Sequence, residues 1–131
     1  MKTKTIAVTV GDPAGIGPEI SIKAMHVFAD RLAQGGLRLL LLGDATTLQE
    51  TARRLDLPAP PVIDVNNIGA APAAAILPTT ALSRPVEIGR VSADCGQQAY
   101  EAVRMAVEQA LAGTVAAIVT VPAPGVRVML S

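Results

Sequence analysis

Apolar residues in this chain alternate between two arrangements: short continuous runs, and longer stretches in which they recur every three or four positions. The first run, residues 5–10, is rich in Thr, Ile and Val and predicts a buried strand. Apolar residues at four-residue intervals then predict a helix from Pro18 to about Ala33, which Gly35-Gly36 ends. The predicted buried face of this helix consists of Ile20, Ala24, Val27, Phe28 and Leu32.

The next segments repeat the order of strand and helix. Residues 37–42 form an apolar run interrupted only by Arg38, which is typical of a strand buried on both faces. Asp44 is a suitable N-cap for a second helix, which stops before Pro58. The apolar stripe of that helix consists of Leu48, Ala52 and Leu55. Residues 62–65 predict a third strand.

Residues 66–85 give a poorer pattern, because three prolines in this segment exclude a long helix. Short strands are possible at residues 73–77 and 86–88. We therefore expect a long, irregular connection here, with a partly antiparallel arm as one possibility.

A regular pattern returns at Asp94. Asp94 and Gln97 form a plausible capping pair for a helix that runs to about Ala112, with Gly113 as its C-cap. Residues 116–121 then predict a further strand. The alternation of strands and helices predicts an α/β fold, in which a mostly parallel sheet is flanked by helices.

The segment 11–19, Gly-Asp-Pro-Ala-Gly-Ile-Gly-Pro-Glu, joins the first strand to the first helix. In open α/β sheets, ligands bind at the carboxyl ends of strands, where such turns lie. Pro18 suits the first helical turn, whose N–H groups attract anions. The glycines lack the spacing of a dinucleotide-binding fingerprint, and no P-loop lysine follows. The residues alone leave two alternatives, a purely structural turn and a turn that binds phosphate or carboxylate.

Composition narrows the class of protein. The 131 residues suit one domain, and aromatic residues make up only 2%, so Ala, Val, Leu and Ile must build the core. The 11 basic and 11 acidic residues balance, so neither nucleic acid nor a membrane surface is an expected partner. The single cysteine, Cys95, excludes an internal disulfide, and no apolar run has membrane-spanning length. We expect a cytoplasmic protein.

Three blocks of sequence occur in an order that resembles one enzyme family. They are residues 11–19, residues 89–100 (Gly-Arg-Val-Ser-Ala-Asp-Cys-Gly-Gln-Gln-Ala-Tyr) and residues 116–122 (Ala-Ala-Ile-Val-Thr-Val-Pro). Together they resemble the 4-hydroxythreonine-4-phosphate dehydrogenase family, from about Thr3 to Pro122. The family's fold is similar to that of isocitrate and isopropylmalate dehydrogenases, which have two α/β lobes and an active site between them. The resemblance implies that this chain forms one incomplete lobe of that fold.

The resemblance also implies a chemistry. The family uses NAD or NADP to oxidise a secondary alcohol beside a carboxylate in 4-hydroxythreonine 4-phosphate, in pyridoxal phosphate biosynthesis. The β-keto acid formed then loses CO₂. A divalent metal holds the hydroxyl and carboxylate and acts as a Lewis acid, and the enzyme works as a homodimer. A related group acts on D-threonate or D-erythronate 4-phosphate, and the blocks fit either group.

Some site residues follow from the resemblance. A similar glycine-rich stretch lies near the cofactor in related decarboxylating dehydrogenases, so Asp12, Gly15 and Ile16 are expected to border the nucleotide. The alternative is that these residues serve only turn and capping geometry. Glu19 either complements the helix dipole or has a catalytic role. Thr120, at the end of a strand, either faces the cleft or simply completes the strand.

Other polar residues have structural explanations. Cys95 and Tyr100, near a helix start, are expected to pack, and Asp64 and Asp94 to form turns or caps. His26 is expected on a helix surface, because the family's metal-binding histidines lie well downstream. We therefore expect no catalytic residue and no metal ligand in this chain, and neither cofactor nor metal bound by it alone.

Residues 123–131 depart from the family pattern, in which a lysine follows the Thr-x-Pro block. Arg127 lies close to that position but out of register. We expect an incomplete lobe over residues 1–122 and an aberrant tail over residues 123–131, as a frameshift or premature end would produce. The alternative to a dehydrogenase is then a catalytically inactive, truncated remnant.

Overall fold

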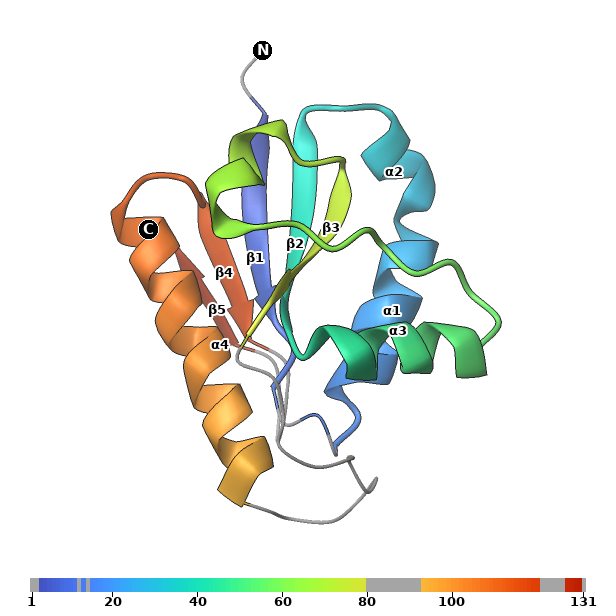
Figure 1. Cartoon of the computed structure of the whole chain (residues 1–131). Helices are drawn as coiled ribbons and strands as arrows, with labels where there is room; N and C mark the ends of the chain where they lie inside the picture. The colour runs from blue at the N-terminus through green and yellow to red at the C-terminus, as the bar shows by residue number, and fades with distance from the viewer. Residues whose placement is uncertain (1–2, 12, 14, 80–92, 121–126, 131) are drawn as a thin grey trace.

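The computed structural model describes residues 3–11, 13, 15–79, 93–120 and 127–130. Its centre is a five-stranded sheet with the strand order β3-β2-β1-β4-β5 (Figure 1). The strands are β1 (Lys4–Thr9), β2 (Leu37–Gly43), β3 (Ala74–Pro78), β4 (Ala117–Thr120) and β5 (Arg127–Leu130). The first four are parallel, and β5 pairs antiparallel with β4. The predicted α/β fold with a mostly parallel sheet is therefore confirmed.

The central strand β1 pairs with β2 on one side and with β4 on the other. In register, Ile6 lies opposite Leu39 of β2 and Ala117 of β4. The chain proceeds from β1 to β2 and β3 in one direction, and then returns to add β4 on the other side of β1. The strand order therefore reverses between β1 and β4, which makes their carboxyl ends a topological switch point.

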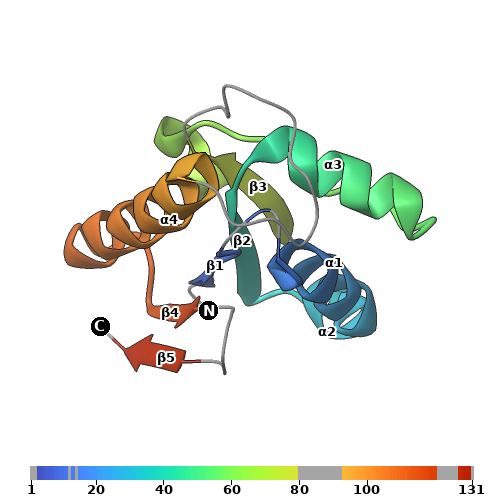
Figure 2. The ribbon, with the colours of Figure 1, turned by 90° about the horizontal axis from the view of Figure 1, so that it is seen from below.

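Helices cover both faces of the sheet. Figure 2 looks at the molecule from below and shows α4 on one face and three helices on the other. The three are α1 (Gly17–Val27), α2 (Ala29–Ala33) and α3 (Ala45–Arg54). The α4 helix (Ala93–Leu111) shares its face with the 3₁₀ helix η1 (Val65–Ala70), because both contribute to the same buried cluster. Within the described part of the chain, no helix has the length and apolar character needed to cross a membrane.

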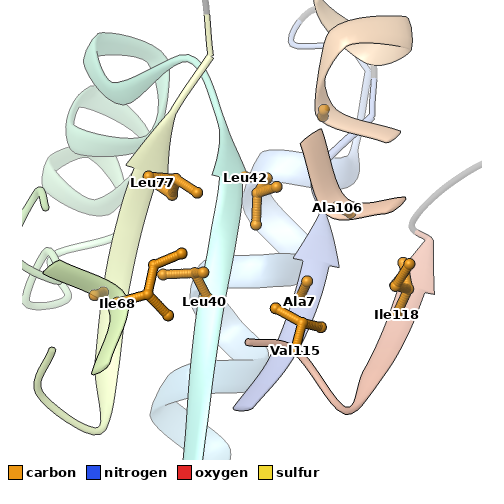
Figure 3. Close-up of a cluster of buried hydrophobic side chains, with 10 residues drawn as sticks. Ala7, Leu40, Leu42, Ile68, Leu77, Ala106, Val115 and Ile118 are labelled. Carbon is orange, nitrogen blue, oxygen red and sulfur yellow. The ribbon is translucent and has the colours of Figure 1, made fainter. Parts of the chain in front are cut away.

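Alternate residues of the strands build one core on each face. Leu40 and Leu42 of β2 and Ala7 of β1 lie in the cluster beneath α4 (Figure 3). Ala102 and Ala106 of α4 are completely buried there, so their small side chains let this helix approach the sheet closely. The core of the opposite face contains Val10, Ile22, Met25, Leu41, Leu48, Ala52 and Ile76. Both cores consist of aliphatic side chains, as the composition predicts.

Glycines end two elements as predicted. Gly35 and Gly36 have φ of +80° and +81° after α2. Gly113 has φ of +83°, and the N–H of Thr114 donates to the carbonyl of Gln109 at 3.0 Å, which closes α4. A positive φ is inexpensive only for glycine, so the sequence marks these ends reliably.

The prediction of a third strand at residues 62–65 is wrong. Val62 makes only an isolated bridge to Ile76, and the third strand is β3. Two prolines precede Val62 and cannot donate to a ladder. Two residues later the Asp64 carboxylate accepts from the N–H of Asn66 at 3.1 Å and starts η1. The alternative strand at residues 73–77 is confirmed within one residue, whereas residues 86–88 lie outside the described part.

The prediction of one helix from Pro18 to Ala33 also needs correction, because the helix is interrupted at Phe28, between α1 and α2. Three residues of its predicted buried face are exposed, Ile20 to 41%, Phe28 to 53% and Val27 to 73%. In a helix with 3.6 residues per turn, side chains four residues apart are offset by about 40° around the helix axis. A row of residues with that spacing therefore turns away from the sheet along the helix. Leu32 is buried as predicted, and the other buried apolar side chains are Ile22 and Met25.

Arg38 is the polar interruption in β2, and its guanidinium fastens η1 to the sheet. Its Nε donates to the carbonyl of Ala71 at 3.1 Å, and its Nη2 to the carbonyl of Gly69 at 3.3 Å. Its Nη1 donates to Thr5 Oγ1 of β1 at 3.0 Å. Hydrogen bonds from a charged donor are stronger than neutral ones, so this residue holds three segments together.

We expect Arg38→Met to lower the free energy of unfolding by about 2 kcal/mol, because three acceptors lose a charged donor. Methionine keeps much of the aliphatic stem, so the loss reports mainly on the hydrogen bonds. Urea unfolding followed by circular dichroism measures the change. Arg31→Met is the matched control, since Arg31 donates one exposed hydrogen bond to Gly35 and should cost under about 0.5 kcal/mol. Equal losses in the two variants would contradict this account of Arg38.

Candidate functional site

Two threonines lie side by side at the switch point, where β1 and β4 end. Thr9 is opposite Thr120 in the parallel register, and neighbouring strands are about 4.8 Å apart. Thr9 lies two positions after Ala7 in β1, and Thr120 lies two positions after Ile118 in β4. Ala7 and Ile118 both belong to the cluster beneath α4. Side chains two positions apart share a face of a strand, so both hydroxyls lie on the α4 face of the sheet. Thr120 is half-buried and Thr9 is completely buried.

Among the residues that the structure describes, the Thr9 hydroxyl has no hydrogen-bond partner, although its oxygen is shielded from solvent. The Ser21 hydroxyl in α1 has the same property at 3% exposure. A buried polar group without a partner costs about 1–3 kcal/mol. Thr9 and Ser21 flank the segment 11–19 in the sequence. The energetic cost of the two unpaired hydroxyls therefore falls close to the turn.

The turn itself leads from β1 to α1 at the carboxyl edge of the sheet. Gly11 has φ of +81°, a backbone conformation that favours glycine. Gly15 and Ile16 are exposed in front of α1, and Ile16 is 61% exposed. Among the described residues, no side chain caps the start of α1. The structure thus brings Gly15 and Ile16 to the switch point, while Asp12 lies outside the described residues.

Asp44 lies at the same edge of the sheet, directly after β2. Its side chain accepts from the N–H of Thr47 at 2.9 Å and from Thr47 Oγ1 at 2.7 Å, both on Oδ2, which confirms the predicted cap of α3. The preceding Gly43 packs against β1 so tightly that an added Cβ would lie 3.1 Å from Val10 Cβ. Asp44 is only 9% exposed at the carboxyl end of β2.

A polar pair lies on the α4 face of the same edge. Thr79 follows β3 directly, and its Oγ1 donates to Gln98 Oε1 of α4. Gln98 is 5% exposed and Thr79 is 8% exposed. The carboxyl edge beneath α4 thus carries hydroxyl and amide groups, whereas the middle of the same face carries alanine and leucine.

The other residues singled out from the sequence lie elsewhere or have structural roles. Glu19 pairs with Lys23 at 3.3 Å within α1, and Asp64 caps η1 as predicted. The expectation that Tyr100 packs is wrong, because it is 61% exposed on α4. Cys95 and Asp94 fall within the backbone of α4, but their side chains lie outside the description.

The described residues do not fit a divalent metal. No group of three or more His, Cys, Asp or Glu side chains converges in this part of the chain. His26 is exposed at the end of α1 and lines an apolar groove of about 320 Å³, whose other lining residues are Ile, Met, Leu, Ala and Pro. A divalent metal needs several converging ligands, and a single imidazole among apolar side chains does not supply them.

Sequence comparison identifies this architecture. The family model for "Pyridoxal phosphate biosynthetic protein PdxA" matches residues 36–126. The chain belongs to the PdxA family. This finding confirms the resemblance that the three sequence blocks carry.

Several members of the PdxA family are similar to nearly all of this chain. D-threonate 4-phosphate dehydrogenase of Salmonella typhimurium is 38% identical over 127 residues, which are 93% of this chain and 38% of that protein. 4-Hydroxythreonine-4-phosphate dehydrogenase of Thermosynechococcus vestitus is 36% identical over 119 residues, covering 90% of this chain and 32% of that protein. The chain therefore spans little more than a third of the length of these relatives.

Solved structures agree with the sequence comparison. The 4-hydroxythreonine-4-phosphate dehydrogenase of Klebsiella pneumoniae superposes with a TM-score of 0.73 at 36% identity, over 92% of this chain and 37% of that one. The enzyme of the same name from Burkholderia phymatum gives a TM-score of 0.75 at 26% identity, over 93% of this chain and 37% of that one. The PdxA fold thus extends over the sheet and helices described above.

Sequence reasoning did not select Thr9, because a threonine in a strand is an ordinary β-former. It selected Asp44 only as a cap. What distinguishes the two residues is their tertiary environment, a buried hydroxyl without a described partner in one case and a position directly after Gly43, which packs on Val10, in the other. No pattern in the sequence reports either property.

We expect Thr9→Val to raise the free energy of unfolding by about 1 kcal/mol, because valine fills the same volume without an unpaired hydroxyl. Thermal unfolding measures the change. Thr51→Val is the matched control, since Thr51 is equally buried but donates to the carbonyl of Thr47 at 2.7 Å. That variant should be neutral or slightly less stable. A loss of stability in Thr9→Val would show that the hydroxyl has a partner.

The cap of α3 provides a second prediction. Asp44→Ala should lower the free energy of unfolding by about 1 kcal/mol, whereas Asp44→Asn should change it by only a few tenths, because asparagine caps as well as aspartate. Urea titrations of both variants measure the difference. Equal destabilisation by the two substitutions would mean that the negative charge of Asp44, rather than its capping oxygen, stabilises the fold.

Proposed function

We propose that this chain contributes the cofactor-facing part of a PdxA-type dehydrogenase, which uses NAD or NADP and a divalent metal to oxidise a small phosphorylated hydroxy acid. The observation that carries this proposal is similarity at 36–38% identity to dehydrogenases over 90–93% of the chain. Because the chain spans only about a third of those proteins, the activity is proposed for the whole architecture and not for these residues alone.

The principal substrate proposed is 4-hydroxythreonine 4-phosphate, which the matching family model and the names of two similar structures support. D-threonate 4-phosphate is the second candidate. One observation favours it slightly, since the Salmonella typhimurium enzyme of that name is 38% identical, compared with 36%, 33%, 34% and 37% for enzymes of the first name. Both substrates join a hydroxyl, a carboxylate and a phosphate in one small molecule.

For the cofactor, we propose that Asp12, Gly15 and Ile16 border the nucleotide. Two features support this assignment: the exposure of Gly15 and Ile16 before α1, and the reversal of strand order beside them. The dinucleotide would supply the hydride acceptor, and the turn would position it by backbone contact. Half a site gives weak binding, so the chain alone should retain no cofactor through purification and should bind it in about the millimolar range.

For the metal, the described residues do not fit, and no step of the reaction is assigned to them. We propose that residues 1–122 form the incomplete lobe and that residues 123–131 are a tail that departs from the family pattern, although Arg127–Leu130 of it pair with β4 as β5. We also propose a protein of the cytoplasm that forms homodimers as the family does. The alternative, a catalytically inactive remnant, differs from the first proposal only in turnover. An assay of the chain itself tests this alternative, because turnover by the chain would contradict an inactive remnant.

The assay is the formation of NADH or NADPH, followed by absorbance, with each of the two substrates and Mg²⁺ or Zn²⁺. We expect no turnover from the 131-residue chain with either substrate, because the part of it that the structure describes has no convergent metal ligands. An EDTA-sensitive signal would contradict that expectation, and the faster substrate would then identify the activity.

Cofactor contact is tested separately by NMR. Titration with NAD⁺ to several millimolar should shift the amide signals of Gly15 and Ile16, while those of Gly35 and Gly113 remain unchanged as internal controls. Uniform shifts, or none at the turn, would contradict the assignment of this turn to the cofactor.

A further inference from the structure

The outer side of α4 carries a stripe of exposed apolar side chains. Tyr100 is 61% exposed, Val107 is 36% exposed and Leu111 is 85% exposed. At about 100° per residue, these three side chains lie within about 40° of one another around the helix axis. Ala102 and Ala106, which pack on the sheet, lie on the opposite side of the helix. We propose that this α4 stripe binds the same stripe of a second copy of the chain, in an antiparallel pair of helices.

The interaction goes beyond the dehydrogenase function proposed above and does not depend on the cofactor contact or on the substrate. It assigns a surface of this chain to contact between copies. A dimer formed through another surface would leave the proposed homodimer standing and would overturn only the role of the α4 stripe.

The first argument is that α4 has more apolar surface than its contact with the sheet requires. Its main neighbours are β1, β2 and β4. Figure 2 shows that α1, α2 and α3 lie on the far side of the sheet. Half-buried Val103 adjoins the stripe, so apolar side chains recur at positions 100, 103, 107 and 111. Spacings of three and four residues are typical of a seam between two helices, and a continuous exposed patch marks an interaction surface.

The second argument is the distribution of charge beside the stripe. Arg104 pairs with Glu101 at 2.6 Å and with Glu108 at 2.5 Å, and these three residues form one border of the stripe. The other border contains Val103 and is apolar. In an antiparallel pair related by a two-fold axis, the charged borders of both helices lie side by side. In a parallel pair, each charged border would instead face an apolar one, so the antiparallel arrangement is favoured.

The third argument is that one register suits both the stripe and its charged border. If Arg104 lies opposite Glu108 of the second copy, then Tyr100 lies next to Leu111 of the second copy, and Val107 lies beside the two-fold axis. The symmetry repeats each of these contacts. The side chains of Arg104 and Glu108 are 43% and 57% exposed, so each can add a partner across the pair. Such charge pairs determine orientation more than affinity.

A second copy suits the stripe better than a membrane surface does. Amphipathic helices that lie on membranes carry mainly Lys and Arg on their polar face, whereas α4 carries one Arg and three acidic residues. The net charge of the chain is zero, so two copies do not repel each other. The stripe extends over only about 17 Å of helix. The interface is therefore smaller than the roughly 1,200 Å² of a stable complex, and the dimer should be weak and reversible.

Sedimentation equilibrium of the whole chain measures the dimer. We expect a dissociation constant on the order of 10–100 µM. Leu111→Lys should raise that constant at least about tenfold, because the two copies bring two ammonium groups into an apolar seam. Val27→Lys is the matched control, since Val27 is 73% exposed at the end of α1 on the other face of the sheet. It should leave the constant within about twofold of the wild type.

Charge reversal tests the antiparallel register. Arg104→Glu should raise the dissociation constant about fivefold, because acidic side chains then face each other across the pair. Adding Glu108→Arg to that variant should restore the wild-type constant, since opposite charges face each other again. Circular dichroism of each variant checks that α4 remains helical, because Arg104 also forms ion pairs within its own helix. Failure of the second substitution to restore the dimer would overturn the antiparallel pair.

Other outcomes also decide the matter. A chain that remains monomeric up to several hundred micromolar overturns the proposal and leaves the stripe to a different partner. A dimer that Leu111→Lys does not weaken overturns it as well, because the copies then meet at another surface. Equal weakening by Val27→Lys would show that the seam is not specific to α4. Should Leu111→Lys lose the fold, Tyr100→Lys repeats the comparison at a position that is also well exposed.

Discussion

Pairing of β1 with β2 along one edge and with β4 along the other holds the described structure together. Because β1 is buried on both faces as well, its side chains determine what can pack above and below it. Ala7 leaves room for α4 on one face, and Val10 contacts α1 and α3 on the other. A larger residue at position 7 would push α4 from the sheet, since a packed core has no spare volume.

The same pairing creates the candidate site. Thr9 and Thr120 are far apart in the sequence, yet the parallel register makes them neighbours at the carboxyl edge. Gly43, which directly precedes Asp44, packs on Val10, which directly precedes the opening turn, for the same reason. The site is therefore a consequence of strand order, and it contains the least well satisfied groups of the described core. An unpaired hydroxyl at Thr9 lowers stability, which is a common property of positions that serve binding rather than folding.

Much of the fold could be predicted from local signals, and particular residues show why. The helix ends at Gly35, Gly36 and Gly113 were predicted correctly, because a positive φ is a property of a single residue. The prediction that Asp44 caps a helix was correct because its partner, Thr47, is only three positions away in the sequence. Predictions failed where contacts between residues far apart in the sequence determine the local structure. Val62 lacks a ladder because the chain turns into η1, and the helix face at Ile20 and Phe28 was misassigned because four-residue spacing does not follow the true helical period.

By itself the sequence determined the order of strands and helices, the aliphatic character of the core and, through three blocks of residues, the PdxA family. These features depend on spacing, local conformation and side-chain type, all of which can be read along the chain. Only the tertiary structure decided that α4 and η1 share one face, that Arg38 ties η1 to β1, and that Thr9 has no partner among the described residues. Each of these depends on which strands become neighbours, and strand pairing joins residues whose distance in the sequence carries no information about their distance in space.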